Sequence, residues 1–444
     1  GNAMFDFWIQ FALVLTAILI GIRRGGVALG LIGGLGVAVL TFGFRVAPSE
    51  PPITVMLIIL AVVTASATLQ VAGGLDFLVQ QAERLMRKHP QQITILAPLS
   101  TFLLTVCVGT GHAVYSLLPV IADVALKTKI RPERPMAIAS VASQMGITAS
   151  PVAAAVTTFL ALTAKTGTPV TLGQILMVTL PAGLIGVIAA ALWSMNRGLD
   201  LDKDPEFLER MKDPAFRASV EMSVTTLDKQ LPRAAKLSVI IFFSGILTIV
   251  ALALFPQLLP LVKGKPMPMT TVVQVVMLAF GAFILFAADV KAAAIAKSEV
   301  FTAGMIAVVS IFGIAWMSDT FVKANETFLV DNIKSMVEYA PWTFALAMFA
   351  VSAFVKSQAA TLTIMLPFGL ALGLSPQLLL GLMPSCYAYF FFAFYPSDLA
   401  AINMDRSGTT RIGKYLLNHS FMIPGWIGVI VSTIVAYGLV QVYF

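Results

Sequence analysis

The sequence predicts an all-α membrane protein built from two related halves. Of its 444 residues, 58% are hydrophobic and only 11% are charged, whereas soluble domains carry about 25% charged residues. The apolar residues gather in long runs, and a membrane-spanning helix needs roughly 20 of them in sequence. Two of these runs are divided by a short polar segment, and one order of elements occurs twice along the chain. These observations predict spanning helices, re-entrant hairpins and an internal repeat.

Ten apolar runs are long enough to form full transmembrane helices. They lie at residues 5–22, 26–43, 53–72, 135–160, 172–195, 236–256, 270–288, 299–318, 377–404 and 419–443. Three residues precede Met4 and are interpreted as left by cloning. The first run follows at once and has no small-residue cleavage site. We therefore expect it to stay as a span rather than to be removed as a signal peptide.

Two further apolar stretches, 93–126 and 342–373, are expected to form re-entrant hairpins. The first is interrupted by Gly109–His112 and the second by Lys356–Thr361, so each consists of two half-length arms around a polar tip. A polar tip at membrane depth must be buried in protein or line a wet cavity. The sequence therefore predicts that both tips lie inside the protein.

The same order of elements follows in both halves of the chain. An amphipathic segment suited to the membrane interface precedes each hairpin, at 74–89 and at 321–340. A span broken at a polar-proline motif follows each hairpin, and the prolines lie at similar spacings, although a chance match among 24 prolines is the alternative. We expect a first repeat at 4–195, a linker at 196–235 and a second repeat at 236–444.

Positively charged loops predict how the chain is oriented. With the N-terminus outside, most of the lysines and arginines of the short loops fall on the cytoplasmic side, together with the linker. Five full spans precede the linker, and because five is odd the second repeat is inverted relative to the first, a hallmark of secondary transporters. The net charge of +7 is spread over these loops, so no nucleic-acid partner is expected.

Four interruptions are expected to meet near the middle of the membrane: the two hairpin tips and the breaks at Thr148–Pro151 and Tyr395–Asp398. A broken helix exposes N–H groups that carry roughly half a positive charge and accept a carboxylate. Ser150 is expected to cap the second part of its helix, with Pro151 as the first helical residue. Ordinary proline kinks are the alternative. The candidate substrate-binding residues are Thr110, Gly111, His112, Thr148, Ser150, Pro151, Lys356, Ser357, Gln358, Thr361, Tyr395, Pro396 and Ser397.

Lys356 and Asp398 are the charged side chains expected near mid-depth, where ionisable groups are costly and usually functional. Lys356 could meet an anionic substrate. Asp398, the candidate coupling residue, could take up a proton or cation, or hold Lys356; a purely structural pair is the alternative. His112 could donate to a carboxylate or be hydrogen-bonded without a further role.

The sequence contains none of the common enzyme signatures, such as a phosphate-binding glycine loop, a HExxH helix or a GxSxG elbow. We therefore expect no catalytic residues and no cofactor, with Na⁺ or H⁺ coupling possible and a metal site left open.

Four stretches carry a family resemblance: QVAGGLDFLV (70–79), ITILAPLSTFLLTVCVGTGH (93–112), ITASPVAAAV (147–156) and, most specific, FYPSDLAAINMDRSGTTRIGKYLLNHSFMIPG (394–425). In these stretches, and from Met4 to the end, the chain resembles the Dcu family of anaerobic C4-dicarboxylate transporters. The resemblance implies the ion-transporter superfamily, an elevator type of movement, a homodimer and a bacterial inner membrane, where the orientation predicted from the charged loops makes both termini periplasmic. It also implies scaffold helices at 4–72 and 236–318 and transport helices at 135–195 and 377–444.

The family resemblance implies an antiporter that takes up fumarate, malate or aspartate in exchange for internal succinate. A Na⁺- or H⁺-coupled symporter of the same substrates is the nearest alternative. An alternative of a different class is a substrate-responsive partner of a membrane sensor kinase. The expected partners are a C4-dicarboxylate, membrane lipid and a second copy of the chain, with a sensor kinase as a further candidate.

Overall fold

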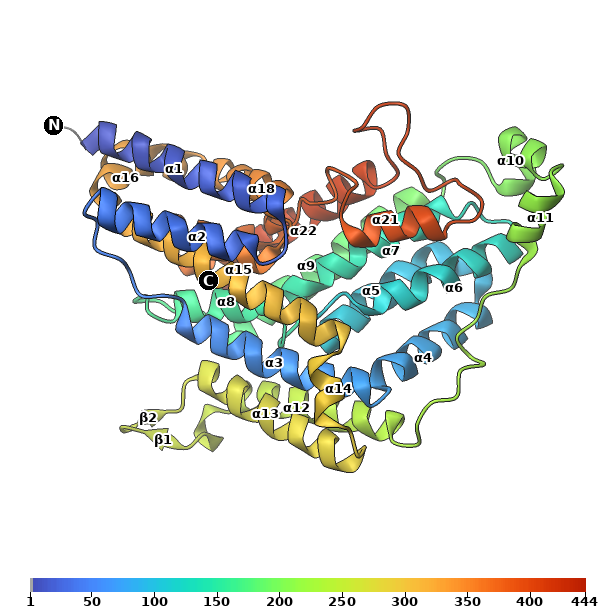
Figure 1. The fold of residues 1–444 in the computed structure, drawn as a ribbon, viewed down its shortest axis with the longest axis horizontal. Helices are drawn as coiled ribbons and strands as arrows, with labels where there is room; N and C mark the ends of the chain where they lie inside the picture. Colours follow the sequence, from blue (N-terminus) through green and yellow to red (C-terminus); the bar gives the residue numbers. More distant parts are fainter. Residues whose placement is uncertain (1–2) are drawn as a thin grey trace.

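The chain folds into a bundle of helices in a computed structural model that describes residues 3–444 (Figure 1). The first two of the residues interpreted as left by cloning lie outside this range. A small antiparallel hairpin pairs β1 (Leu261–Val262) with β2 (Lys265–Pro266).

Among the described residues, the first half of the chain contains nine α-helices and three short helical turns. They are α1 (Ala3–Arg24), α2 (Ala28–Ala38) with a π-helical turn η1 (Val39–Gly43), α3 (Ile53–Val71), α4 (Gly74–Lys88), η2 (Pro90–Gln92), α5 (Ile93–Val108), α6 (Ala113–Lys127), α7 (Glu133–Met145), η3 (Gly146–Ala149), α8 (Ala154–Thr163) and α9 (Leu172–Ser194).

The linker and the second half continue in a parallel order. The linker holds η4 (Leu201–Lys203), α10 (Pro205–Arg210) and α11 (Pro214–Glu221). The second half holds α12 (Ala235–Leu254), η5 (Pro256–Leu258), α13 (Met269–Ala287), α14 (Ala292–Ala296), α15 (Glu299–Ala324), α16 (Glu326–Asn332), α17 (Lys334–Tyr339), α18 (Trp342–Val355), α19 (Gln358–Ala371), α20 (Pro376–Leu382), η6 (Met383–Cys386), α21 (Pro396–Met404) and α22 (Met422–Tyr443).

Within residues 3–444, nine helical segments are long and apolar enough to cross a membrane. Eight of them coincide with predicted full spans, and the ninth is Pro90–Val108, the first arm of the first expected hairpin. The predicted span at 377–404 is broken, as the sequence predicts, but the interruption is longer than the expected Tyr395–Asp398: a non-helical segment at 387–395 separates η6 from α21. Pro384 lies in η6 shortly before this segment and Pro396 directly follows it, and proline cannot donate the backbone hydrogen bond that a helix interior needs.

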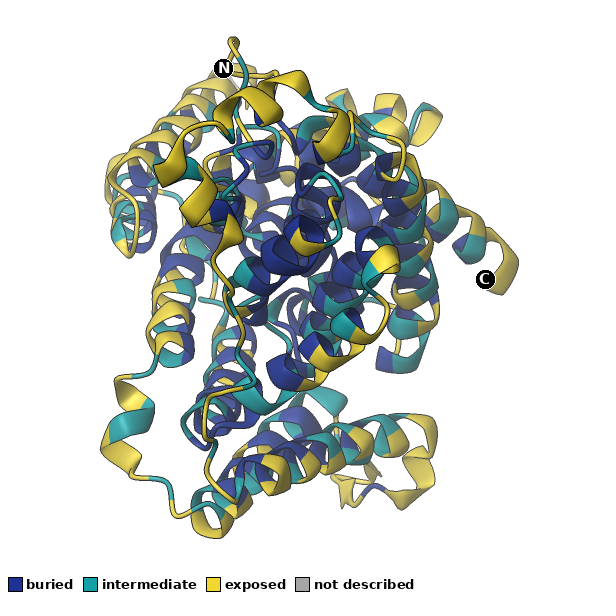
Figure 2. Ribbon diagram, turned by 90° about the vertical axis from the view of Figure 1, so that its right-hand side faces the viewer, coloured by how far each residue is buried: buried dark blue, intermediate teal, exposed yellow. Residues whose placement is uncertain are grey.

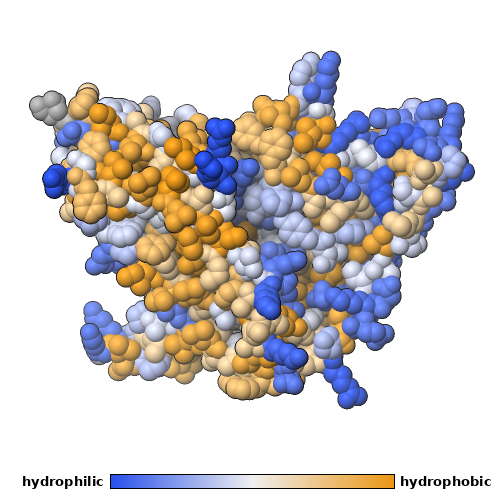
Figure 3. Space-filling model, in the orientation of Figure 1, coloured by the Kyte–Doolittle hydropathy of each residue, from blue (hydrophilic) through white to orange (hydrophobic). Residues whose placement is uncertain are grey.

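The exposed surface is apolar over much of the bundle. Figure 2 shows that buried residues gather at the centre, while exposed residues follow the outer helix faces and the linker. Large apolar side chains such as Leu247 of α12 and Phe286 of α13 are among the exposed ones. Figure 3 shows hydrophilic residues gathered over α10 and α11, at the right-hand end of this view. This distribution suits helices surrounded by lipid and a linker in water.

The two halves exchange contacts in a reciprocal way. The second helix of each half packs on the third long helix of the other half, as α2 on α15 and α13 on α3. The second hairpin arms also pack on the far part of the opposite broken segment, as α6 on α21 and α19 on α8. A Cβ on Gly313 would lie 1.7 Å from the carbonyl oxygen of Gly30, so glycine is required where α15 crosses α2. Two related halves would produce this reciprocal pattern of contacts.

Hydrogen bonds fix the linker to the body rather than leaving it as a free connector. Figure 1 shows it passing the ends of α6 and α4 on its way from α11 to α12. The buried Glu83 carboxylate of α4 accepts the backbone N–H of Thr226 at 2.7 Å and the guanidinium of Arg87 at 2.7 Å. Burial opposes ionisation of Glu83, but the hydrogen bonds from Thr225, Thr226 and Arg87 outweigh it and lower its pKa. Arg87 extends the network to Asp123 of α6 at 3.0 Å.

Candidate functional site

A cavity of about 590 Å³ lies where both hairpin tips meet the segment before α21. Helices α1, α3 and α15 form its opposite wall, and it reaches the loop between α1 and α2. The wall includes these predicted site residues: Thr110, Gly111, His112, Lys356, Ser357, Gln358, Tyr395 and Pro396. The structure therefore brings together both hairpin tips and the second predicted break, and the first break adjoins the cavity through its neighbours Ile147 and Val152.

The two hairpin tips turn in the same way. Helix α5 is followed by Gly109 with φ +88°, and α18 is followed by Lys356 with φ +60°. Both residues are in the left-handed region that often ends a helix. A Cβ on Gly109 would lie 2.9 Å from the Val152 carbonyl oxygen, so this tip has no room for a side chain. The left-handed backbone is less favourable for lysine than it would be for glycine. Lys356 is one of the residues that line the cavity.

The second tip presents the start of a helix to the cavity. The Ser357 hydroxyl accepts the backbone N–H of Ala360 at 3.2 Å and caps α19. Thr361, in the first turn, donates instead to the carbonyl of Ser357 at 2.7 Å and does not line the cavity. The positive end of the α19 dipole and the Ser357 hydroxyl therefore lie together at the wall of the cavity.

The break between α7 and α8 is arranged differently from the prediction. Helix α8 begins at Ala154, so the expected cap at Ser150 with Pro151 as the first helical residue is wrong. The Ser150 hydroxyl instead accepts the N–H of Val152 at 3.3 Å, which closes a turn, and Ala153 is extended before α8 begins. The Thr148 hydroxyl donates to the Met145 carbonyl. The predicted site residues outside the cavity wall are Thr148, Ser150, Pro151, Thr361 and Ser397.

Asp398 lies buried behind the cavity wall in the first turn of α21. Its Oδ1 accepts a hydrogen bond from Ser140 of α7 at 2.6 Å, and the Ser140 hydroxyl lies 2.9 Å from that of Ser397. Its Oδ2 has no hydrogen-bond partner among the described residues. The ion pair with Lys356 that the sequence allowed is not among the ion pairs of residues 3–444; a serine hydroxyl holds the carboxylate instead.

Among the wall residues that sequence reasoning missed are Gln144 and Tyr389, which are hydrogen-bonded to each other. The Tyr389 hydroxyl donates to Gln144 Oε1 at 2.7 Å, and Gln358 Nε2 donates to the Gln144 backbone carbonyl at 2.7 Å. A polar amide inside the apolar run 135–160 was an available signal for Gln144. Tyr389 gave no comparable signal, because it stands in a run of aromatic residues at 387–392.

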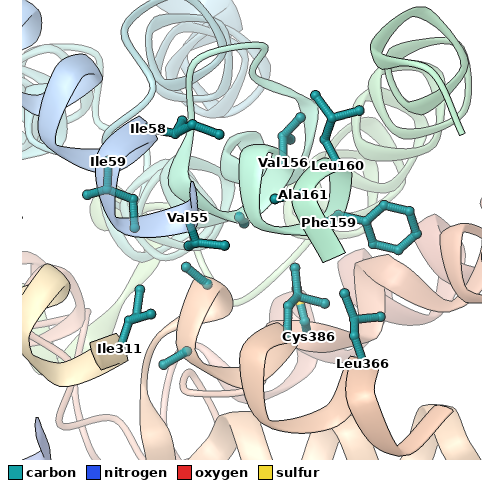
Figure 4. Close-up of a cluster of buried hydrophobic side chains, with 14 of the residues drawn as sticks. Val55, Ile58, Ile59, Val156, Phe159, Leu160, Ala161, Ile311, Leu366 and Cys386 are labelled. Carbon is teal, nitrogen blue, oxygen red and sulfur yellow. The ribbon is translucent and has the colours of Figure 1, made fainter. Parts of the chain in front are cut away.

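An apolar cluster separates this cavity from a second one. Figure 4 shows Val55 and Ile58 of α3 on one side of α8, and Phe159 of α8 on its other side above Leu366 of α19. Beyond the cluster lies a cavity of about 420 Å³ that reaches the loop before α3 and is lined partly by charged residues, including Lys165. The two cavities are therefore lined by different parts of the same four helices, α3, α8, α15 and α19.

Comparisons with known proteins agree with the motifs. The profile of the family described as "Anaerobic c4-dicarboxylate membrane transporter" matches residues 6–444. The chain is 45% identical over 441 residues to the anaerobic C4-dicarboxylate transporter DcuB of Escherichia coli O157:H7, covering 98% of this chain and 99% of that protein. It is 38% identical to the C4-dicarboxylate transporter DcuA of Wolinella succinogenes, covering 95% of this chain and 96% of that protein.

Two solved transporter structures share the fold. The YdaH transporter of Alcanivorax borkumensis aligns with a TM-score of 0.56 at 14% identity, covering 96% of this chain and 98% of that one. MtrF of Neisseria gonorrhoeae aligns with a TM-score of 0.56 at 12% identity, covering 98% of this chain and 94% of that one. At these identities the likeness concerns the fold alone.

Proposed function

The chain belongs to the family of anaerobic C4-dicarboxylate membrane transporters, and we propose that it is an antiporter that takes up fumarate, malate or aspartate in exchange for internal succinate. Membership of this family makes it a multi-pass membrane transporter and not an enzyme. The observation that carries the proposal is the cavity in which Lys356 and the start of α19 meet the first hairpin tip.

The charges around the cavity suit a small dianion. A C4-dicarboxylate brings two negative charges, and Coulomb attraction grows as the surroundings become less polar. Lys356 provides a full positive charge at the cavity wall, and the start of α19 provides a partial one together with the Ser357 hydroxyl. His112 and Thr110 line the other tip, and the Thr110 hydroxyl has no hydrogen-bond partner among the described residues. We propose that these groups bind the substrate carboxylates.

The arrangement of the two cavities supports alternating access. In the proposed state, the substrate cavity is open beside the loop between α1 and α2, while the apolar cluster around Ile58 and Phe159 closes the other side. We propose that the hairpins and broken segments move as a unit past α3 and α15, in an elevator type of movement that would open the second cavity to the substrate site.

The experiment that tests this site is competition against uptake of labelled succinate in proteoliposomes. A site built for two carboxylates should accept fumarate, malate and aspartate as competitors and discriminate strongly against butyrate, which lacks the second carboxylate. Competition by butyrate as strong as that by fumarate would contradict a site for two carboxylates.

Cation-coupled symport is a second candidate, favoured by Asp398. A buried carboxylate oxygen without a partner is unfavourable unless a proton or cation compensates it. We propose Asp398 as the coupling residue if transport proves to be coupled. Uptake into vesicles without internal dicarboxylate, driven by a Na⁺ or pH gradient, would favour symport over exchange.

We also propose the orientation that the sequence predicts, in a bacterial inner membrane. Figure 1 shows both ends of the chain on the same side as β1 and β2, and α10 and α11 on the opposite side. Both termini would then be periplasmic and the linker cytoplasmic. A homodimer through the scaffold helices, which include the largely exposed α12 and α13, remains part of the proposal, and a sensor kinase remains a candidate partner.

A further inference from the structure

Three buried side chains from both halves form one hydrogen-bonded set at the cavity wall. Gln144 lies in the last turn of α7, Gln358 begins α19, and Tyr389 lies in the non-helical segment before α21. Their exposed fractions are 4%, 2% and 2%. Gln358 Nε2 donates to the Gln144 carbonyl at 2.7 Å and to the Tyr389 hydroxyl at 3.2 Å. All three line the cavity, so substrate would meet a set of groups that ties the two halves together.

These contacts use the donor capacity of Gln358. Its amide nitrogen carries two N–H groups, and both have partners within the set. Its Oε1 is approached by the Cys386 thiol at 3.7 Å. Although the sequence placed Gln358 among the substrate-binding residues, its side chain is engaged in joining α19 to α7.

The same contacts orient the Gln144 amide. Because the Tyr389 hydroxyl accepts from Gln358, its own proton is free to be donated to Gln144 Oε1, at 2.7 Å. The oxygen of the Gln144 amide is therefore occupied, and its nitrogen faces the first hairpin tip. A Cβ on Gly111 would lie 2.7 Å from Gln144 Nε2, and the nitrogen's one hydrogen bond, to Ser143, is long at 3.3 Å. Gln144 thus has an N–H group available beside the tip.

We propose that Gln144 determines specificity by donating this N–H to a substrate carboxylate, and that Tyr389 is a positioning residue that fixes the orientation of its amide. The inference rests on the proposed dicarboxylate site. The two ends of an amide have nearly the same shape, so packing alone does not choose between them. The Tyr389 hydroxyl selects one orientation, because it donates its proton to the amide oxygen of Gln144. The amide nitrogen then faces the substrate carboxylate.

The first test compares Tyr389→Phe with the wild type in proteoliposomes. The variant loses one hydroxyl and keeps the ring. We expect the KM for succinate to rise about tenfold, in line with the loss of a hydrogen bond to a charged group, with little change in the maximal rate. Preference for succinate over succinamate, in which an amide replaces one carboxylate, should also fall. Tyr437→Phe, on the half-exposed face of α22, is the matched control and should change neither value.

The second test is independent of Tyr389. Gln144→Glu keeps the shape but replaces the N–H donor by an anionic oxygen, whereas Gln144→Leu only removes the donor. We expect both to raise the KM for succinate, and Glu to raise it far more than Leu at equal expression and melting temperature. Equal effects of Glu and Leu, or an unchanged KM and selectivity in Tyr389→Phe, would overturn the inference. A wild-type protein that does not transport succinate would instead refute the proposed function.

Discussion

Ser140 of α7 donates a hydrogen bond to Asp398 of α21 at 2.6 Å, across 258 positions of sequence. The two residues come from the broken segments of different halves, and the Asp398 carboxylate is almost fully buried. One of its oxygens is held by this hydroxyl, and the other has no partner among the described residues. The bond fixes the carboxylate directly behind Tyr395 and Pro396 of the cavity wall, where it can respond to a proton or cation without touching the substrate.

Asp398→Asn should change the pH or cation dependence of transport more than dicarboxylate binding. The amide has a similar shape and can still accept from Ser140, but it cannot hold a proton or cation in the same way. Rates measured across pH and Na⁺ concentration should become flatter, while the affinity for succinate stays within about threefold. Asp331→Asn, on the exposed surface of α16, serves as the control. An unchanged pH and Na⁺ profile together with lost succinate binding would count against a coupling role.

Lys356→Asn should weaken succinate binding about tenfold or more, because the full positive charge of the cavity wall is lost. Asparagine is chosen because it tolerates the left-handed backbone at φ +60° better than alanine does. Lys356→Arg keeps the charge and should recover part of the affinity. Lys263→Asn is a matched control, since Lys263 has φ +53° in the turn between β1 and β2, far from the cavity. An unchanged affinity of Lys356→Asn for succinate would contradict this role of Lys356. Helix ends and neutral groups would then have to bind the carboxylates alone.

Glu83→Gln should destabilise the protein by about 1–3 kcal/mol, because a buried charged acceptor of several hydrogen bonds becomes a poorer one. The pKa of Glu83 is lowered in the folded protein, so its contribution is present above the ordinary glutamate pKa of 4.5 and is lost as the pH falls through the lowered value. Melting temperatures in detergent should therefore fall toward acid pH more steeply in the wild type than in the variant. Glu209→Gln on the exposed linker helix α10 is the control, and equal acid slopes in all three proteins would argue against this linkage.

Cysteine labelling tests the proposed orientation. A cysteine replacing Lys263, in the turn between β1 and β2, should react with a membrane-impermeant thiol reagent added to intact cells. A cysteine replacing Arg210 in α10 should react only after the membrane is opened. The wild type, with Cys107 and Cys386 in place, gives the background. Labelling of the Arg210 position in intact cells would overturn both the orientation and the inverted relation of the repeats.

Local signals in the sequence were enough to locate the helices around both tips. Helices α5 and α6 meet around Gly109–His112, and α18 and α19 around Lys356, because glycine and polar residues inside an apolar run mark a turn in any tertiary context. The same signal failed at 387–395. That segment is rich in aromatic residues, and an apolar run of this length does not distinguish a helix from an extended chain.

The side-chain contacts of the site could not be read from the sequence, because they join distant positions. The role of Tyr389 depends on Gln144, 245 positions away. Ser150 has the residue type and proline neighbour of a helix cap, yet its hydroxyl closes a turn with Val152 and α8 begins later. A local sequence pattern indicates that such a contact is possible, but whether it forms depends on how the two halves pack together.

Exchange itself is the most direct test of the proposed function. Proteoliposomes containing the purified protein are loaded with succinate or with buffer alone, and uptake of labelled fumarate is measured without any Na⁺ or pH gradient. The account predicts rapid uptake only into succinate-loaded vesicles, with one succinate released for each fumarate taken up. Equal uptake into both kinds of vesicle, or uptake that requires an imposed cation gradient, would contradict antiport.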